Sequence, residues 1–206
     1  MKNILVAVAP KTLHSFLPPE KLDDLKKIAP VQALDEIRKD EEWYADKLKA
    51  ADAEIVITGW GAPKITATVK EKNPQLKYMC HLTGTVKSFV ERPVIEDGLT
   101  VTNWGSAIGP TVAEGALLGI LCCLRRTTEI TFQMHGEKTW KKNGFEESLF
   151  YQRVGLHGFG AISRSLVRLL QPFQCRISTS SPHAPDNTLK EHNVKRMATL
   201  KELYTE

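Results

Sequence analysis

The glycine-rich segment at residues 154–162 constrains the fold of this chain more than any other stretch. Apolar residues before it are typical of a buried strand, and a helix is predicted after it, ending near Pro172. A strand, a tight turn and a helix in this order gather backbone N–H groups and the positive end of a helix dipole, which favours a bound anion. Gly158 would permit the turn, Gly160 would let a pyrophosphate approach, and Ser163 takes the place of the usual third glycine. The segment predicts a dinucleotide-binding turn, and an ordinary glycine turn of an α/β domain is the alternative.

The residues before this segment alternate between apolar runs and helical patterns. Strands are predicted at residues 3–8, 31–34, 54–58, 76–81 and 99–103, and helices at residues 19–28, 41–50 and 66–72. This alternation favours a parallel sheet with helices on both faces. Because ligands bind beyond the carboxyl ends of such strands, the turns at residues 59–63 and 83–85 are candidate site walls.

A long helix is predicted at residues 111–126, and its small residues suggest close packing in an interior or at a subunit interface. The face concerned comprises Val112, Gly115, Ala116, Gly119, Ile120 and Cys123. After the glycine turn, the sequence predicts a strand at residues 175–179, a polar loop, a short strand at residues 194–197 and a helix from residue 199.

Composition excludes several classes of function. The 206 residues carry a formal net charge of +4, and basic residues are dispersed except in the run 138–142, which we interpret as a solvated loop, so no nucleic-acid partner is expected. The four cysteines form no C-x-x-C pair and are expected to be reduced, mostly buried thiols of a cytoplasmic protein, with no metal site. No signal-peptide core is present, and the apolar run 115–124 is too short to span a membrane, so no membrane partner is expected.

Motifs spread along nearly the whole chain resemble the D-isomer-specific 2-hydroxyacid dehydrogenases, the phosphoglycerate dehydrogenase-like family. They are Leu76-Lys77-Tyr78, Thr83-Gly84-Thr85, Val101-Thr102-Asn103, Val112-Ala113-Glu114, Arg125, Trp140 and the glycine segment itself, in the order and at the spacing of the family.

The resemblance implies a flavodoxin-like substrate domain at residues 1–103 and an incomplete NAD(P)-binding Rossmann domain at residues 104–206, with a linker helix at 111–126. It implies hydride transfer between NAD or NADP and a small 2-hydroxy or 2-keto acid, and a homodimer in the full-length form. Backbone N–H groups of Gly84 and Thr85 would bind the substrate carboxylate. The pyrophosphate contacts would fall on Gly158, Gly160, Ala161 and Ile162.

The sequence departs from the family at both binding loops. Thr83, Thr85 and Lys87 stand where the family usually has two glycines and an aspartate, and we favour a solvated Lys87 over a substrate contact. The acidic residue expected after the strand at 175–179 is replaced by serines, of which Ser181 is the candidate cofactor contact. Without that carboxylate nothing repels a 2′-phosphate, so NADP is as credible as NAD.

The family's catalytic Arg, Glu and His would lie beyond residue 206, so no catalytic residue is assigned within the chain. The histidines that could substitute for them are rejected as catalytic, although His81 stands near the substrate loop: His14, His81, His135 and His157. We expect the 206 residues to be inactive alone and to be part of a longer gene product or of a damaged gene. The strand at 153–157 would then lack a neighbour on one side. The alternative is a non-catalytic module of the same fold that senses a dinucleotide or binds a partner.

Overall fold

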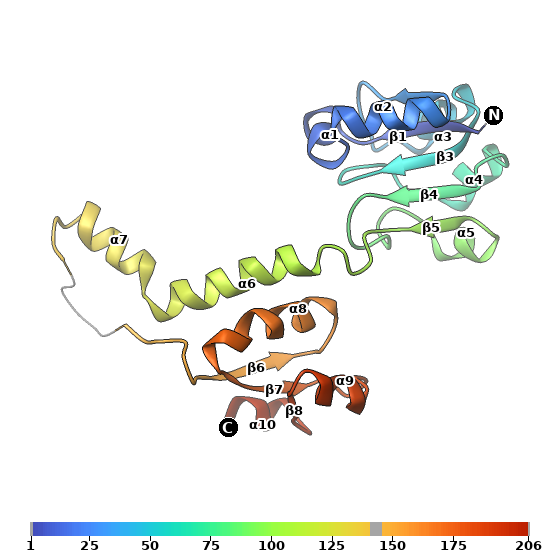
Figure 1. The fold of residues 1–206 in the computed structure, drawn as a ribbon. Helices are drawn as coiled ribbons and strands as arrows, with labels where there is room; N and C mark the ends of the chain where they lie inside the picture. Colours follow the sequence, from blue (N-terminus) through green and yellow to red (C-terminus); the bar gives the residue numbers. More distant parts are fainter. Residues whose placement is uncertain (1, 141–145, 206) are drawn as a thin grey trace. The chain divides into compact units, whose positions relative to one another are not determined.

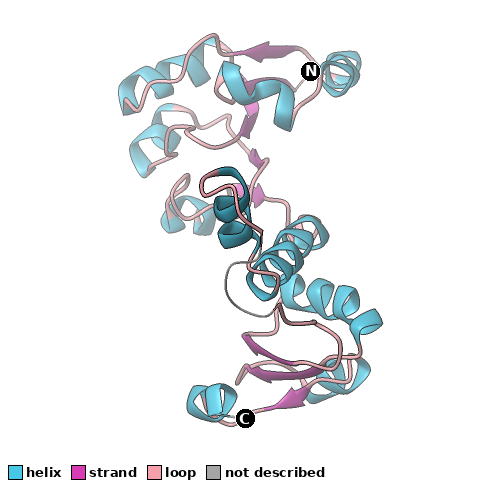
Figure 2. Ribbon diagram, turned by 90° about the vertical axis from the view of Figure 1, so that its left-hand side faces the viewer, coloured by secondary structure: helices cyan, strands magenta, loops and turns pink. Residues whose placement is uncertain are grey.

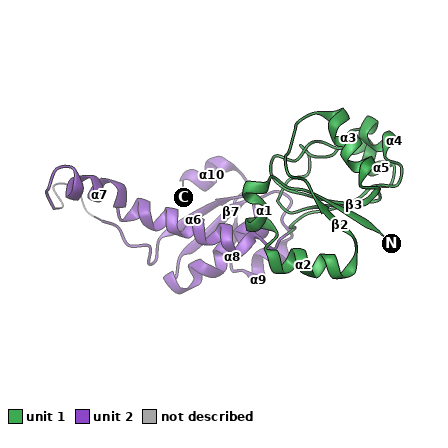
Figure 3. Cartoon of the chain, turned by 90° about the horizontal axis from the view of Figure 1, so that it is seen from above, with its two compact units in different colours: residues 1–105 green, residues 106–206 purple. Residues whose placement is uncertain are grey.

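The computed structural model describes residues 2–140 and 146–205, and the chain divides into two compact units, Met1–Gly105 and Ser106–Glu206 (Figure 3). The sequence places this boundary between residues 103 and 104. The last two residues of the basic run 138–142 lie outside the described residues. Each unit contains one sheet with helices packed on it (Figure 2).

The first unit is built on a parallel sheet of five strands in the order β2-β1-β3-β4-β5 (Figure 1). The strands are β1 (Asn3–Ala7), β2 (Val31–Ala33), β3 (Ala53–Thr58), β4 (Tyr78–His81) and β5 (Thr100–Thr102). All four pairings are parallel. The order 2-1-3-4-5 is that of flavodoxin-like folds, which confirms the predicted α/β class.

Helices cover both faces of this sheet because alternate residues of its strands point to opposite sides. Leu5 and Val56 pack with α3 (Glu41–Ala50), α4 (Ala67–Lys72) and α5 (Arg92–Glu96) in one core. Ile4 and Val6 pack on the other side against α1 (Pro10–Phe16) and α2 (Pro19–Ile28). The sequence did not predict α1 or α5, which are short helices that each begin at or beside a proline.

The second unit carries a three-stranded parallel sheet in the order β6-β7-β8. Its elements are α6 (Gly109–Leu124), α7 (Thr127–His135), β6 (Arg153–His157), α8 (Ala161–Leu170), the 3₁₀ turn η1 (Gln171–Phe173), β7 (Arg176–Ser180), α9 (Asp186–Glu191), β8 (Lys195–Arg196) and α10 (Leu200–Thr205). In a doubly wound order 3-2-1-4-5-6 these strands correspond to 1, 2 and 3. Within the described residues, β6 has a neighbour on one side only, as the sequence predicts.

On one face of this sheet, α6 lies along α8 (Figure 1). Gly109, at the start of α6, comes so close to the start of α8 that an added Cβ would stand 3.3 Å from the Ala161 carbonyl oxygen. On the opposite face, Leu203 of α10 packs over Gly155 of β6.

The structure adds two helices and corrects the expected burial of the cysteines. Residues 127–135, for which no element was predicted, form α7, and part of the predicted polar loop forms α9. On the small-residue face of α6, Val112, Gly115, Gly119 and Cys123 are exposed, so of the two predicted roles the subunit interface stays a prediction. The four cysteines are free, as expected, but three are half-buried and Cys123 is exposed rather than buried.

Candidate functional site

The turn between β6 and α8 has the backbone conformation that the glycine pattern predicts. Gly158 has φ +89°, a region that other L-residues rarely adopt. Its N–H donates to the Ser180 carbonyl oxygen at 2.9 Å, which ties the turn to the end of β7. An added Cβ would meet nothing within 4 Å, so the backbone angle, and not crowding, demands glycine here.

Two hydroxyl groups hold the turn in place from beneath. Ser163 Oγ donates to the Gly158 carbonyl oxygen at 3.0 Å, and Thr179 Oγ1 donates to the Leu156 carbonyl oxygen at 2.9 Å. Ser163 therefore does more than replace a third glycine, because its side chain stabilises the turn. Thr179 was not singled out from the sequence, since its role depends on the register that pairs it with Leu156.

The start of α8 is open to an anion. Gly160 caps the helix without a side-chain hydrogen bond, and no residue in the described part of the chain accepts from the N–H groups of Ala161 or Ile162. A Cβ on Gly160 would point into open space. Unpaired N–H groups and the positive helix end are what a pyrophosphate needs, so the predicted residues fit a dinucleotide.

The loop after β7 holds Ser181, the candidate contact for the adenosine ribose. Arg196 at the end of β8 fixes this loop: its Nη1 donates to the Ser181 carbonyl oxygen at 2.6 Å and its Nη2 to the Ala184 carbonyl oxygen. Arg196 also pairs with Asp186, at 2.7 Å. A pocket of about 460 Å³ lies here, lined by Pro182, Ala184, Pro185, Asp186, Arg196, Met197 and Ala198. Arg196 was not singled out from the sequence, because it acts on residues ten or more positions earlier.

In the first unit, the loop after β4 presents the predicted substrate contacts. Gly84 and Thr85 are exposed, and their N–H groups have no hydrogen-bond partner among residues 2–140 and 146–205. Asn103 Nδ2 donates to the Gly84 carbonyl oxygen, and the Trp104 N–H donates to the Thr83 carbonyl oxygen at 3.2 Å. The loop is thus held by its carbonyl groups while its N–H groups stay available. Lys87 is exposed, as the solvated interpretation predicts.

His81, at the end of β4, lies beneath this loop and not in a position to touch a ligand. Its side chain is 1% exposed, and its ring lies 4.3 Å from that of Phe89. Thr58 Oγ1 stands 2.8 Å from Nδ1, and Thr83 Oγ1 stands 2.5 Å from Nε2. Burial lowers the pKa of His81, so the imidazole is neutral. The histidine links the sheet to Thr83, at the start of the substrate loop.

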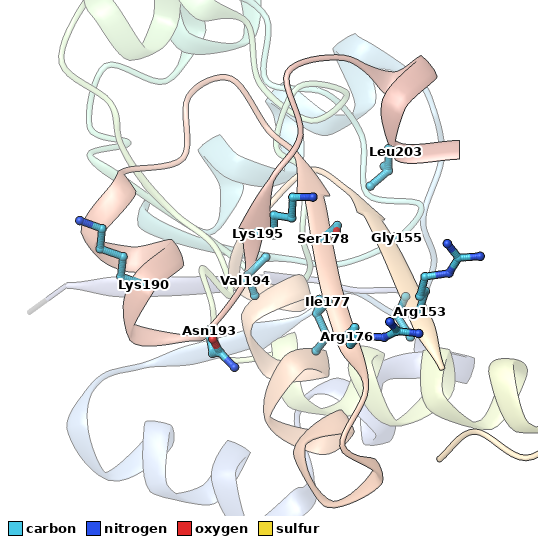
Figure 4. Close-up of a pocket in the computed structure, with 11 residues that line it drawn as sticks. Arg153, Gly155, Arg176, Ile177, Ser178, Lys190, Asn193, Val194, Lys195 and Leu203 are labelled. Carbon is cyan, nitrogen blue, oxygen red and sulfur yellow. The ribbon is translucent and has the colours of Figure 1, made fainter. Parts of the chain in front are cut away.

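The second unit also holds a pocket of about 700 Å³ (Figure 4). It is lined by the first three residues of β6 and of β7, with Lys195 of β8 and Leu203 of α10. These are the amino ends of the strands, whereas Gly158 follows a carboxyl end. Since ligands of doubly wound sheets bind beyond the carboxyl ends, this pocket is not the candidate dinucleotide site.

Among residues 2–140 and 146–205, no group of three or more His, Cys, Asp or Glu side chains could hold a metal ion. No helix in these same ranges is both long and apolar enough to cross a membrane.

A parallel sheet whose first strand runs through a glycine turn into an uncapped helix defines a Rossmann-type dinucleotide-binding unit. Residues 117–206 match the family model described as "D-isomer specific 2-hydroxyacid dehydrogenase, NAD binding domain". This match covers the second half of the chain, and it agrees with the resemblance of the motifs to that family. NAD or NADP as the cofactor class agrees with the match.

Individual relatives support the same assignment. The hydroxypyruvate reductase of Thermotoga maritima is 28% identical over 142 residues, which are 68% of this chain and 46% of that protein. The solved PH0520 protein of Pyrococcus horikoshii is 25% identical, with a TM-score of 0.71 over 98% of this chain and 59% of that one. An acyclic imino acid reductase solved with NADPH and D-Arg shares the fold, with 18% identity and a TM-score of 0.77 over 98% of this chain and 62% of that one. The chain spans about half the length of the curated relatives it matches.

Proposed function

We propose that this chain supplies the binding elements of an NAD(P)-dependent dehydrogenase that interconverts small 2-hydroxy and 2-keto acids. The observation that carries the proposal is the open start of α8, where glycine backbone and unpaired N–H groups meet. The hydroxypyruvate reductase relative points to the same class of substrate.

In this proposal each loop has a separate task. Gly158 and Gly160 let the pyrophosphate approach, and the N–H groups of Ala161 and Ile162 donate to it. Ser181 contacts the adenosine ribose. The cofactor, when bound, supplies or accepts the hydride.

The loop that holds Gly84 and Thr85 binds the substrate in this proposal. The N–H groups of Gly84 and Thr85 donate to the carboxylate of the acid, a charge-assisted contact that orients the carbon bearing the oxygen. His81 is not proposed as the general acid or base, because it is buried and both of its nitrogens are occupied by threonine hydroxyls.

We assign no proton-transfer group to these 206 residues, and we propose that the chain by itself binds without turnover. The alternative function is a non-catalytic module that senses a dinucleotide, which would use the same glycine turn. Reduction of a 2-keto acid by a product that carries this chain together with a downstream Arg, Glu and His would distinguish the two.

We also propose that the full-length form is a homodimer that uses the exposed side of α6 and α7. Leu118 is 63% exposed and Phe132 is 64% exposed, which is unusual for large apolar side chains on neighbouring helices. A Cβ added to Gly115 or Gly119 would meet nothing within 4 Å, so another helix could approach closely there.

The test is a titration of the chain with NADH and with NADPH, followed by fluorescence, beside an assay of 2-keto acid reduction. We expect saturable binding with a dissociation constant above the micromolar range, and no turnover. The variant Gly160→Val should lose binding, because its side chain would occupy the phosphate position. Absence of binding by either dinucleotide at millimolar concentration, or equal binding by Gly160→Val, would contradict the assignment of the turn. Reduction of a 2-keto acid by the 206-residue chain alone would contradict the proposal that the chain binds without turnover.

A further inference from the structure

We propose that three aromatic residues, Phe16, Trp60 and Trp104, form a wall beside the substrate loop that selects 2-hydroxy acids with an aromatic or large apolar side chain. This inference rests on the proposed function, because it takes the Gly84–Thr85 loop as the carboxylate site. It goes further in naming which acids the site accepts.

The three rings are in contact although they are far apart in sequence. Phe16 meets Trp60 edge to face, with ring centroids 5.0 Å apart and planes at 90°. Phe16 also lies 6.1 Å from Trp104. Such geometry is favourable for aromatic pairs and holds the rings in fixed positions.

The wall is continuous with the carboxylate loop through Trp104. The Trp104 N–H donates to the Thr83 carbonyl oxygen at 3.2 Å, and the neighbouring Asn103 side chain donates to the Gly84 carbonyl oxygen. The segment that carries one ring of the wall therefore also fixes the loop whose N–H groups face a ligand.

Strand order explains why these segments converge. In the order β2-β1-β3-β4-β5, the strands β1, β3, β4 and β5 are successive neighbours and all are parallel. Phe16 follows β1, Trp60 follows β3, Thr83 follows β4 and Trp104 follows β5, so all four lie beyond the carboxyl edge. The connections reverse direction between β1 and β3, and this switch point is where open α/β sheets bind ligands.

The turn that carries Trp60 is built to present its ring. Gly61 has φ +81°, which bends the chain directly after Trp60. Gly59 lies against Val8 and Phe16, and a Cβ there would stand 3.3 Å from Val8 Cγ1. Trp60 itself remains 60% exposed. A large ring that packs against another ring and remains largely in solvent is suited to cover an apolar group of a ligand.

The test uses the intact 206-residue chain and three acids that share the 2-hydroxy carboxylate: D-lactate, D-phenyllactate and D-gluconate. Binding is followed by NMR, at the Gly84 and Thr85 amide signals and at the indole N–H signals. All three acids should shift the two amides, and D-phenyllactate alone should shift the Trp60 indole. We expect D-phenyllactate to bind about tenfold more tightly than D-lactate, which corresponds to ~1.4 kcal/mol.

The variant Trp60→Ala should reduce that preference to about twofold. Trp43→Phe is the matched control, because Trp43 packs on the opposite face of the sheet from Phe16 and should keep the full preference. Equal affinity for D-lactate and D-phenyllactate would contradict the proposal that the three rings select apolar side chains. Tighter binding of the polyhydroxylated D-gluconate than of D-phenyllactate would contradict it as well. If none of the acids shifts Gly84 or Thr85, the proposed carboxylate site fails instead, which is a separate result.

Discussion

Replacement of His81 by alanine should destabilise the first unit by about 3–5 kcal/mol. The imidazole makes two hydrogen bonds, and its removal leaves the buried hydroxyls of Thr58 and Thr83 unpaired, at a cost of about 1–3 kcal/mol each. Loss of the contact with Phe89 adds about 1 kcal/mol, and partial relaxation of the hydroxyls reduces the total. Since domains are stable by only about 5–15 kcal/mol, this effect is large.

Urea denaturation of the whole chain can isolate this effect. Trp43, Trp60 and Trp104 all lie in the first unit, so a Trp140→Phe background makes tryptophan emission a reporter of that unit alone. Thr83→Ser is the matched control, because it keeps the hydroxyl group and should cost about 1 kcal/mol or less.

The pH dependence of the same measurement tests the neutral state of His81. Its folded-state pKa is lowered by burial, below the unfolded value of about 6.5, so the unfolded chain binds more protons. The stability that neutral His81 contributes is therefore present above pH ~6.5 and is lost as the pH falls below it. The difference between wild type and His81→Ala should shrink between pH 7.5 and pH 5. A loss under 1 kcal/mol, or the same loss at both pH values, would refute this description of the buried histidine.

Three further predictions follow from single side chains. The Tyr44 hydroxyl is buried without a hydrogen-bond partner in the described chain, so Tyr44→Phe should raise the free energy of unfolding by about 1 kcal/mol. A decrease of that size in urea denaturation would contradict this, because it would mean that the hydroxyl makes a hydrogen bond. Arg196→Ala should speed amide exchange in residues 181–186 by at least about tenfold, because charged hydrogen bonds hold that loop, and unchanged exchange would contradict its role. In the full-length form proposed to be a homodimer, Leu118→Asp should give a monomer in sedimentation equilibrium. A dimer that persists in this variant would exclude the exposed side of α6 as the interface.

The parallel strands and the glycine turn could be predicted from the sequence because their signals are local. An apolar run such as residues 53–58 is typical of a buried strand, and the structure has a strand there. Gly158 has the positive φ that its pattern implies. The short helices α1 and α9 could not be predicted in the same way. Each spans seven residues or fewer, and α9 buries only Leu189, so tertiary packing rather than an amphipathic pattern stabilises them.

The residues that support the candidate site also could not be identified from the sequence. Thr58 and His81 are paired by the register of β3 and β4, which no local pattern reveals. Arg196 reaches back to Ser181, and Trp104 reaches back to Thr83. Sequence motifs identify the backbone that faces a ligand, whereas the side chains that hold that backbone are known only after the strands are in place.

The most direct test of this account is chemical-shift mapping of the 206-residue chain with NADH. The amide signals of Gly158, Gly160, Ala161 and Ile162 should shift together and saturate, with smaller shifts at Ser181 and none at the amino ends of β6 and β7. Gly160→Val should remove these shifts while the remaining spectrum stays that of a folded chain. Saturating shifts at Arg153 and Arg176 in the pocket at the amino ends, with none at the glycine turn, would contradict the account.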